Sequence, residues 1–194
     1  MRNTDVSDNE LITQFLQGNE KALESLITRH QRKVFTSIFL LVKDKELAED
    51  LFQETFIKVI NTLRSGNYHE EGKFLPWVVR IGHNLVIDHF RKQKRMPMVR
   101  DTEEFSVMDS LKLTDDNIED KIIVNQIHKE IRQLIESLPL DQREVVIMRH
   151  YGDMSFKEIA ECTNVSINTS LGRMRYALIN LRKFIEEKQL VLVK

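Results

Sequence analysis

Hydrophobic residues recur every three to four positions along most of the chain, which is the spacing of amphipathic helices. The alternation typical of strands is scarce, and prolines and glycines are few. We therefore predict an all-α fold. The predicted helices cover residues 9–17, a stretch from about 20 to 41 whose spacing allows a break near His30, and the segments 46–63, 74–95, 121–138 and 141 onward.

The composition is typical of a cytoplasmic protein. Hydrophobic residues make up 41% and charged residues 30% of the sequence, and the single cysteine, Cys162, excludes an intramolecular disulfide. The N-terminus has no apolar signal core, and the longest apolar run, over 37–42, is too short to span a bilayer. We therefore predict a cytoplasmic location without membrane insertion.

The net charge of −1 hides three blocks of different charge. Residues 1–100 have 16 basic and 13 acidic side chains, residues 101–120 have 1 and 8, and residues 121–194 have 12 and 9. Helical periodicity is lost over 98–120, where mutual repulsion favours an extended linker. We predict two helical domains, an N-terminal helical bundle over 1–97 and a C-terminal domain over 121–194, joined by this acidic linker.

One face of the predicted 74–95 helix combines an aromatic ring with cationic and short polar side chains. At about 100° per residue they fall within an arc of roughly 80°, opposite an apolar face. A ring can stack on an unpaired base, contributing about 1–3 kcal/mol per base, and guanidinium groups bind phosphates. A solvated face with an Asp88–Arg91 ion pair would explain the same pattern. This polar stripe consists of Trp77, Arg80, Asn84, Asp88, Arg91 and Arg95.

Residues 153–178 have the form of a helix-turn-helix unit. Ser155 and Glu158 match a capping box at the start of its first helix, and Asn164 suits the left-handed conformation of the turn. A helical hairpin that binds no nucleic acid would share this pattern. As a DNA-binding unit, its second helix would present Ser166, Asn168, Thr169, Ser170, Arg173 and Tyr176 to the major groove and the phosphates.

Asp50, Gln53 and Glu54, which we call the acidic cluster, share the polar side of the predicted 46–63 helix. A solvated face is the simplest interpretation, and a protein-docking patch is the more specific one. Catalysis is disfavoured because no histidine or metal-ligand spacing accompanies the carboxylates, and the chain lacks P-loop, GxGxxG, GxSxG and HExxH motifs. We expect Cys162 to be a buried, inert thiol. The sequence therefore predicts no catalytic residue, no metal site and no cofactor.

Taken in chain order, these three features resemble an extracytoplasmic-function (ECF) sigma factor of the sigma-70 family, the small two-domain type of bacterial transcription initiation factor. The sequence AEDLFQETFIKVI resembles the family's core-polymerase-binding helix. FLPWVVRIGHNLVIDHFRKQKR resembles its promoter-melting and minus-ten segment, and LPLDQREVVIMRHYGDMSFKEIAE the start of its minus-thirty-five domain. The chain departs from many relatives in the second helix of the helix-turn-helix, where a lysine is missing and Gly172 lowers helix propensity by about 1 kcal/mol.

The resemblance implies a non-enzymatic sigma factor that binds core RNA polymerase, at the clamp helices of its β′ subunit, and directs it to promoter DNA. The polar stripe would read the minus-ten element as an opened single strand, and the helix-turn-helix would read the minus-thirty-five element as duplex. Asp88 would be either a base reader or a clamp on Arg91. The family often uses an anti-sigma factor, although no motif here requires one. Polymerase binding would involve Asp50, Leu51, Gln53, Glu54 and Phe56.

The alternative function is that of a stand-alone helix-turn-helix transcriptional regulator. Such a protein would bind its promoter tightly without polymerase, and the acidic cluster would have no role. A nucleic-acid enzyme is disfavoured because it needs a cluster of metal-binding carboxylates and histidines that the sequence does not supply.

Overall fold

The computed structural model describes residues 6–69, 73–95 and 130–188. Every regular element within these ranges is an α-helix, which confirms the all-α prediction. The predicted acidic linker over 98–120 lies outside the described residues, and so does the first part of the helix predicted over 121–138. The domain boundaries therefore stay a prediction. None of the described helices has both the length and the apolar character that crossing a membrane requires.

Four helices form the N-terminal half: α1 (Asp8–Leu16), α2 (Glu20–Val42), α3 (Lys45–Arg64) and α4 (Phe74–Arg95). The helix starts follow local capping, since Ser7 forms a capping box with Glu10, and Asp44 accepts a hydrogen bond from the backbone of Leu47. The apolar sides of α2, α3 and α4 meet in the core, where Val78 and Val86 of α4 are fully buried.

Helix α2 continues without interruption through His30, so the break that we allowed there does not occur. The His30 side chain is largely buried, and its Nε2 lies 2.8 Å from Oδ2 of Asp8 in α1. Arg29 donates to the other oxygen of the same carboxylate at 2.7 Å. A residue of another helix therefore supplies the hydrogen-bond partner of the buried His30 ring, so α2 need not break there. The spacing of residues within α2 could not reveal this partner.

The C-terminal half consists of a helical segment over 130–136 followed by α6 (Leu140–His150), α7 (Phe156–Thr163) and α8 (Ile167–Glu187). The predicted helix-turn-helix is present in its details. Ser155 and Glu158 form the capping box of α7, Asn164 ends α7 with φ 53°, and Ser166 caps α8 by accepting from the backbone of Thr169.

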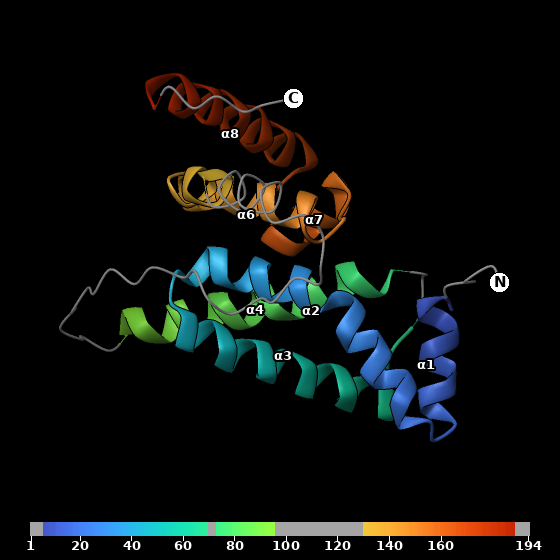
Figure 1. Ribbon diagram of the computed structural model, residues 1–194. Coiled ribbons are helices and arrows are strands. Elements are labelled where there is room, and N and C mark those ends of the chain that lie inside the picture. Colours follow the sequence, from blue (N-terminus) through green and yellow to red (C-terminus); the bar gives the residue numbers. More distant parts are fainter. Residues whose placement is uncertain (1–5, 70–72, 96–129, 189–194) are drawn as a thin grey trace, which may run out of the picture.

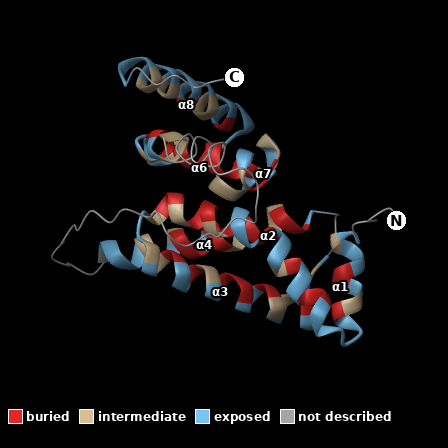
Figure 2. Cartoon of the chain, viewed as in Figure 1, coloured by how far each residue is buried: buried red, intermediate tan, exposed pale blue. Residues whose placement is uncertain are grey.

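The two halves pack against each other. Figure 1 shows α6 and α7 lying between the N-terminal bundle and the outermost helix, α8. One cluster of buried hydrophobic residues runs from α1 to α8, and Figure 2 shows buried positions on helices of both halves. This arrangement brings α7, the first helix of the helix-turn-helix, next to α4, the helix of the polar stripe.

Candidate polymerase and nucleic-acid interface

The C-terminal part of the polar stripe lies open on α4. Asn84, Asp88 and Arg91 are exposed, whereas nothing is described for the side chain of Arg95. Asp88 and Arg91 form an ion pair at 3.4 Å with both side chains more than half exposed, so solvent screens it. The described conformation pairs Asp88 with Arg91, and the two roles considered for Asp88 stay predictions.

Trp77, by contrast, is only half-exposed. Its ring lies 4.5 Å from the ring of Tyr68 and 5.8 Å from the ring of Phe74, measured between centroids. Phe74 is itself in the core. One part of the indole therefore packs on the bundle, and the remainder is exposed.

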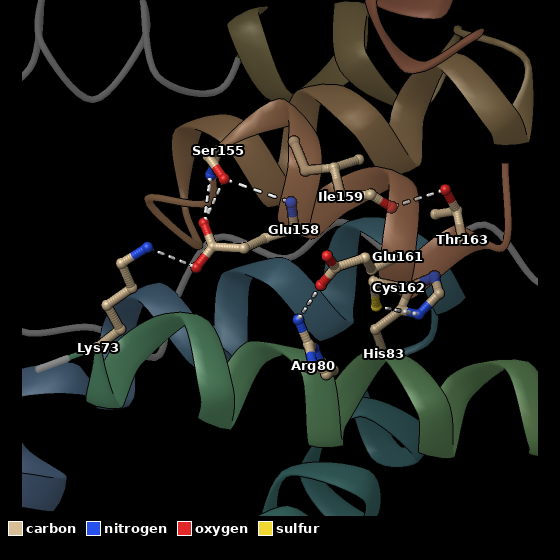
Figure 3. Close-up of polar contacts among 9 residues, drawn as sticks. All are labelled: Lys73, Arg80, His83, Ser155, Glu158, Ile159, Glu161, Cys162 and Thr163. Carbon is tan, nitrogen blue, oxygen red and sulfur yellow. Dashed lines mark hydrogen bonds and ion pairs between the residues drawn. The ribbon is translucent and has the colours of Figure 1, made fainter. Parts of the chain in front are cut away.

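Arg80, on the same stripe, faces α7 and is partly exposed. One of its terminal nitrogens lies 3.9 Å from a carboxylate oxygen of Glu161, as Figure 3 shows. One turn earlier along α7, Glu158 accepts a hydrogen bond from Lys73 at 2.9 Å. Burial raises the pKa of Glu158, but hydrogen bonds from Ser155 and Lys73 outweigh it and lower that pKa to about 2. The Glu158 carboxylate is thus charged at any physiological pH.

The acidic cluster is exposed on α3, as a docking surface requires. Asp50, Gln53 and Glu54 all face solvent, and Glu54 pairs with Lys58 on the same helix, at 3.4 Å. Leu51 and Phe56 are each 6% exposed and belong to the core. We assigned these two to polymerase binding, and the structure corrects that assignment, because a side chain enclosed by its own core cannot contact a partner.

Sequence analysis missed Ile57, which is 57% exposed beside the acidic cluster. Its signal was present, since an apolar residue three positions after Glu54 falls on the polar side of the helix. An exposed isoleucine within this face adds apolar area to a surface that is otherwise polar. We therefore group Ile57 with the acidic cluster as a candidate contact.

The start of α8 presents part of the predicted DNA-reading set. Asn168, Thr169 and Tyr176 are exposed, and Ser166 is exposed although its hydroxyl is engaged in the helix cap. Ser170 is fully buried, so it packs α8 onto the domain and does not face DNA, which corrects its assignment.

Two arginines on α8 differ in their availability. Arg173 lies 3.5 Å from the carboxylate of Asp141 and is mostly covered. Arg175 is exposed and was missed by sequence analysis, which assigned only Arg173 as the cation of this helix. A basic residue two positions after Arg173 was the available signal.

A buried polar contact joins the two halves at α4. His83 Nε2 lies 3.1 Å from Oε1 of Glu144 in α6, and its Nδ1 lies 3.6 Å from the thiol sulfur of Cys162 in α7. His83 and Glu144 are both buried, while Cys162 is half-buried. Burial lowers the pKa of His83, but the hydrogen bonds to Cys162 and Glu144 and the attraction of these groups outweigh it, so the pKa rises to about 9.

The chain matches two family models. Residues 26–96 match sigma-70 region 2, and residues 128–173 match sigma-70 region 4. The first match covers the bundle helices that carry the acidic cluster and the polar stripe, and the second covers the helix-turn-helix up to Arg173. The two matches thus follow the order that the resemblance predicts.

Relatives of known function match along nearly their whole length. The RNA polymerase sigma-H factor of Pseudomonas aeruginosa is 26% identical, over 90% of this chain and 93% of its own. The ECF RNA polymerase sigma-E factor of Escherichia coli is 28% identical, over 90% and 94%, and the ECF sigma factor SigW of Bacillus subtilis is 26% identical, over 91% and 95%.

Solved structures agree on the fold. CnrH in complex with the cytosolic domain of CnrY matches with a TM-score of 0.62 at 20% identity, over 94% of this chain and 99% of that chain. The sigma factor RpoE in complex with the anti-sigma factor NepR from Bartonella quintana matches with a TM-score of 0.61 at 18% identity, over 86% and 98%. With both regions matched in order and with these relatives, the chain belongs to the extracytoplasmic-function group of the sigma-70 family, non-catalytic factors that direct RNA polymerase to promoters.

Proposed function

We propose that this sigma factor acts in the cytoplasm and divides its work among three surfaces of the described chain. The acidic cluster on α3 binds the clamp helices of core RNA polymerase, the polar stripe on α4 reads the minus-ten element, and the start of α8 reads the minus-thirty-five element. The observation that carries the proposal is that these three surfaces, found separately in the sequence, are exposed at least in part on a single helical frame.

The chemistry of the α3 surface suits a cationic partner. Asp50 and Glu54 lie one turn apart on the exposed side, with the amide of Gln53 beside them and Ile57 next along the helix. Leu51 and Phe56 hold α3 on the bundle from the opposite side. A rigid helix can therefore offer these groups to polymerase with little loss of backbone freedom on binding.

The chemistry of the α4 surface suits an opened strand more than a duplex. A duplex buries its bases, whereas a single strand offers base faces for stacking on Trp77 and base edges for Asn84. Arg80 and Arg91 would contact phosphates and so position the strand without reading it. Expelling a base from the stack costs a few kcal/mol, least where pairing is already weak, so opening favours weakly paired sequence.

The start of α8 suits the major groove of duplex DNA. Its capped end leads into the exposed Asn168 and Thr169, and its N-terminal backbone N–H groups favour contact with a phosphate. Tyr176 and Arg175 extend the exposed surface along the next two turns. Asn168 is the clearest candidate for a bidentate contact with adenine.

We infer that an anti-sigma factor is a further candidate partner. One solved neighbour, the RpoE sigma factor, is in complex with the anti-sigma factor NepR, and another, CnrH, is in complex with the cytosolic domain of CnrY. The support is the shared fold, which both neighbours present to a bound protein.

Capture of core polymerase tests the docking surface. We expect Asp50→Ala combined with Gln53→Ala to weaken holoenzyme assembly, because it removes one carboxylate and one amide from the exposed side of α3. Glu24→Ala combined with Gln31→Ala is the matched control, since both positions are exposed on α2 and the same group types are lost. The measurement is the affinity of purified full-length chain for core polymerase. Equal affinities for the two double variants would refute docking through α3.

A further inference from the structure

An exposed leucine lies on the side of α8 that faces DNA in the proposed function. Leu171, in the second turn of the helix, is 44% exposed. It follows Asn168 by three positions and precedes Arg175 by four, so these three exposed side chains share one side of the helix. Ser170 and Ala177 are fully buried on the other side. Leu171 therefore projects from the surface that would enter the major groove, away from the side that holds α8 on its domain.

The charge of the same helix suits duplex DNA. Residues 166–185 contain four basic side chains and no acidic one. Arg175, Arg182 and Lys183 are exposed, whereas Arg173 is paired with Asp141. The backbone N–H groups at the capped start of α8 add partial positive charge. Contacts to phosphates fix the position of a helix in a groove without reading sequence, so any discrimination between bases must come from the other exposed side chains.

The apolar character of Leu171 restricts which base it can recognise. A leucine side chain has neither donor nor acceptor, so it cannot hydrogen-bond to a base edge. In the major groove thymine presents a C5-methyl group, and apolar side chains contact that group. Removing one buried methyl from such a contact changes an equilibrium constant about fourfold. Thymine is therefore the base that Leu171 can select.

The neighbouring glycine leaves room for a base pair to approach. A Cβ on Gly172 would meet no heavy atom within 4 Å, so packing within the described chain does not require a glycine there. A glycine inside a helix lowers its stability relative to alanine. What the glycine does provide is close access to the backbone for another molecule. The open position lies directly beside Leu171 and one turn after Asn168.

We propose that Leu171 is a specificity-determining residue that contacts the C5-methyl group of one thymine in the minus-thirty-five element. The proposal rests on the function proposed for α8. Leu171 lies about 4.5 Å further along the helix axis than Asn168, and base pairs are stacked about 3.4 Å apart. The thymine therefore lies within one or two base pairs of the base that Asn168 contacts.

Replacing thymine by deoxyuridine tests the contact, because it removes the methyl group and keeps every hydrogen bond of the base pair. Holoenzyme assembled from the full-length chain first selects its tightest-bound duplex from a randomised library. Each thymine of the minus-thirty-five element in that duplex is then replaced singly. We expect one replacement to weaken closed-complex binding about fourfold. An element without thymine, or one in which no replacement weakens binding, overturns the proposal.

An alanine variant assigns the sensitive thymine to Leu171. Leu171→Ala should bind the thymine and uracil duplexes equally, because its side chain is too short to reach the methyl group. The matched control is Leu178→Ala, which truncates a leucine of the same helix that is 48% exposed and lies two turns further on. Leu178→Ala should keep the fourfold difference between the two duplexes. Discrimination that persists in Leu171→Ala, or that Leu178→Ala also abolishes, contradicts a contact through Leu171.

Repeating the selection with Asn168→Ala separates this proposal from the function proposed for α8. If holoenzyme enriches no minus-thirty-five sequence, or if Asn168→Ala enriches the same sequence as the original chain, the function proposed for α8 fails and the thymine contact fails with it. If Asn168→Ala changes the enriched sequence but uracil weakens binding equally for the original chain and Leu171→Ala, α8 reads the element and only the role of Leu171 is refuted.

Discussion

At the scale of single residues, the protonation of His83 makes the stability of the fold depend on pH. Glu144 from α6 and Cys162 from α7 face its ring, and although burial opposes the charge, these partners raise its pKa to about 9. A histidine without partners has a pKa of about 6.5. A raised pKa means that the pair contributes its full stability below about pH 6.5, and that this contribution is lost as the pH rises through about 9.

We therefore expect the stabilisation by Glu144 to decrease with rising pH. Glu144→Gln removes the negative charge and keeps the size of the side chain, so the free energy of unfolding should fall most at about pH 6.5 and much less at about pH 9.5. Urea unfolding at each pH measures the difference in free energy of unfolding between the original chain and Glu144→Gln. The contributions of other titrating groups are the same in both proteins and cancel in this difference. A difference that is constant or grows with pH would show that His83 is not charged in the fold.

Substitution of Trp77 tests whether the polar stripe takes part in promoter opening. Trp77→Ala removes packing on Tyr68 and Phe74 as well as a stacking surface, so we expect a loss of stability of about 2–4 kcal/mol. Promoter opening by the holoenzyme should fall about tenfold, since one base stack contributes about 1–3 kcal/mol, while binding to closed duplex changes less. Permanganate reactivity of unpaired thymines measures opening.

The matched control is Phe90→Ala, another half-buried aromatic of α4, which lies outside the stripe. Both variants should lose stability, but only Trp77→Ala should lose opening. Equal losses of opening in the two variants would mean that Trp77 serves the bundle alone.

At the scale of helices, alanine substitutions at two glycines separate the effect of helix propensity on stability from the effect of packing. A Cβ on Gly172 in α8 would meet no heavy atom within 4 Å, whereas a Cβ on Gly82 in α4 would lie 3.2 Å from Ile38 and 3.3 Å from Thr55. We expect Gly172→Ala to raise the free energy of unfolding by about 1 kcal/mol. Gly82→Ala gains the same propensity but crowds two buried side chains, so it should destabilise the fold. Urea unfolding measures the change in free energy of unfolding for each variant. Changes of the same sign would contradict the close packing of Gly82 against Ile38 and Thr55.

The helix ends were predictable because their causes are local. Ser155 with Glu158, Asn164 in the turn and the cap at Ser166 each act within four residues, and the structure has all of them. The orientation of individual side chains was less predictable. Leu51 and Phe56 are apolar residues that border the exposed side of α3, and Ser170 is a polar residue on the same side of α8 as Ala177; the structure buries all three.

The contact between the halves could not be predicted from the sequence. His83 and Glu144 are ordinary polar residues in their own helices, and only the fold brings them together over 61 positions. No periodicity encodes a pairing over such a separation. The same applies to the pair of Lys73 with Glu158, in which a residue recognised as a helix cap also binds a cation of the other half.

At the scale of the whole molecule, the connection between the halves does not itself force them together. Residues 96–129 could span at most roughly 110 Å at about 3.3 Å per residue, far more than the diameter of a small domain. The packed arrangement must therefore be maintained by the contacts of α2 and α4 with the C-terminal half. Weakening those contacts should let the halves separate without unfolding either one.

Small-angle X-ray scattering can follow that separation. We expect the free chain to have a radius of gyration within a few ångströms of the roughly 16 Å typical of a compact protein of this length. Lys33→Glu, Glu144→Gln and Glu161→Lys together remove or reverse charges at three places in the contact, so the radius should rise by several ångströms while the far-ultraviolet circular dichroism stays helical. Since Glu187→Lys makes the same charge change as Glu161→Lys on an exposed part of α8, it should leave the radius unchanged. A free chain that is already extended, or a triple variant as compact as the original, would show that these contacts do not hold the halves together.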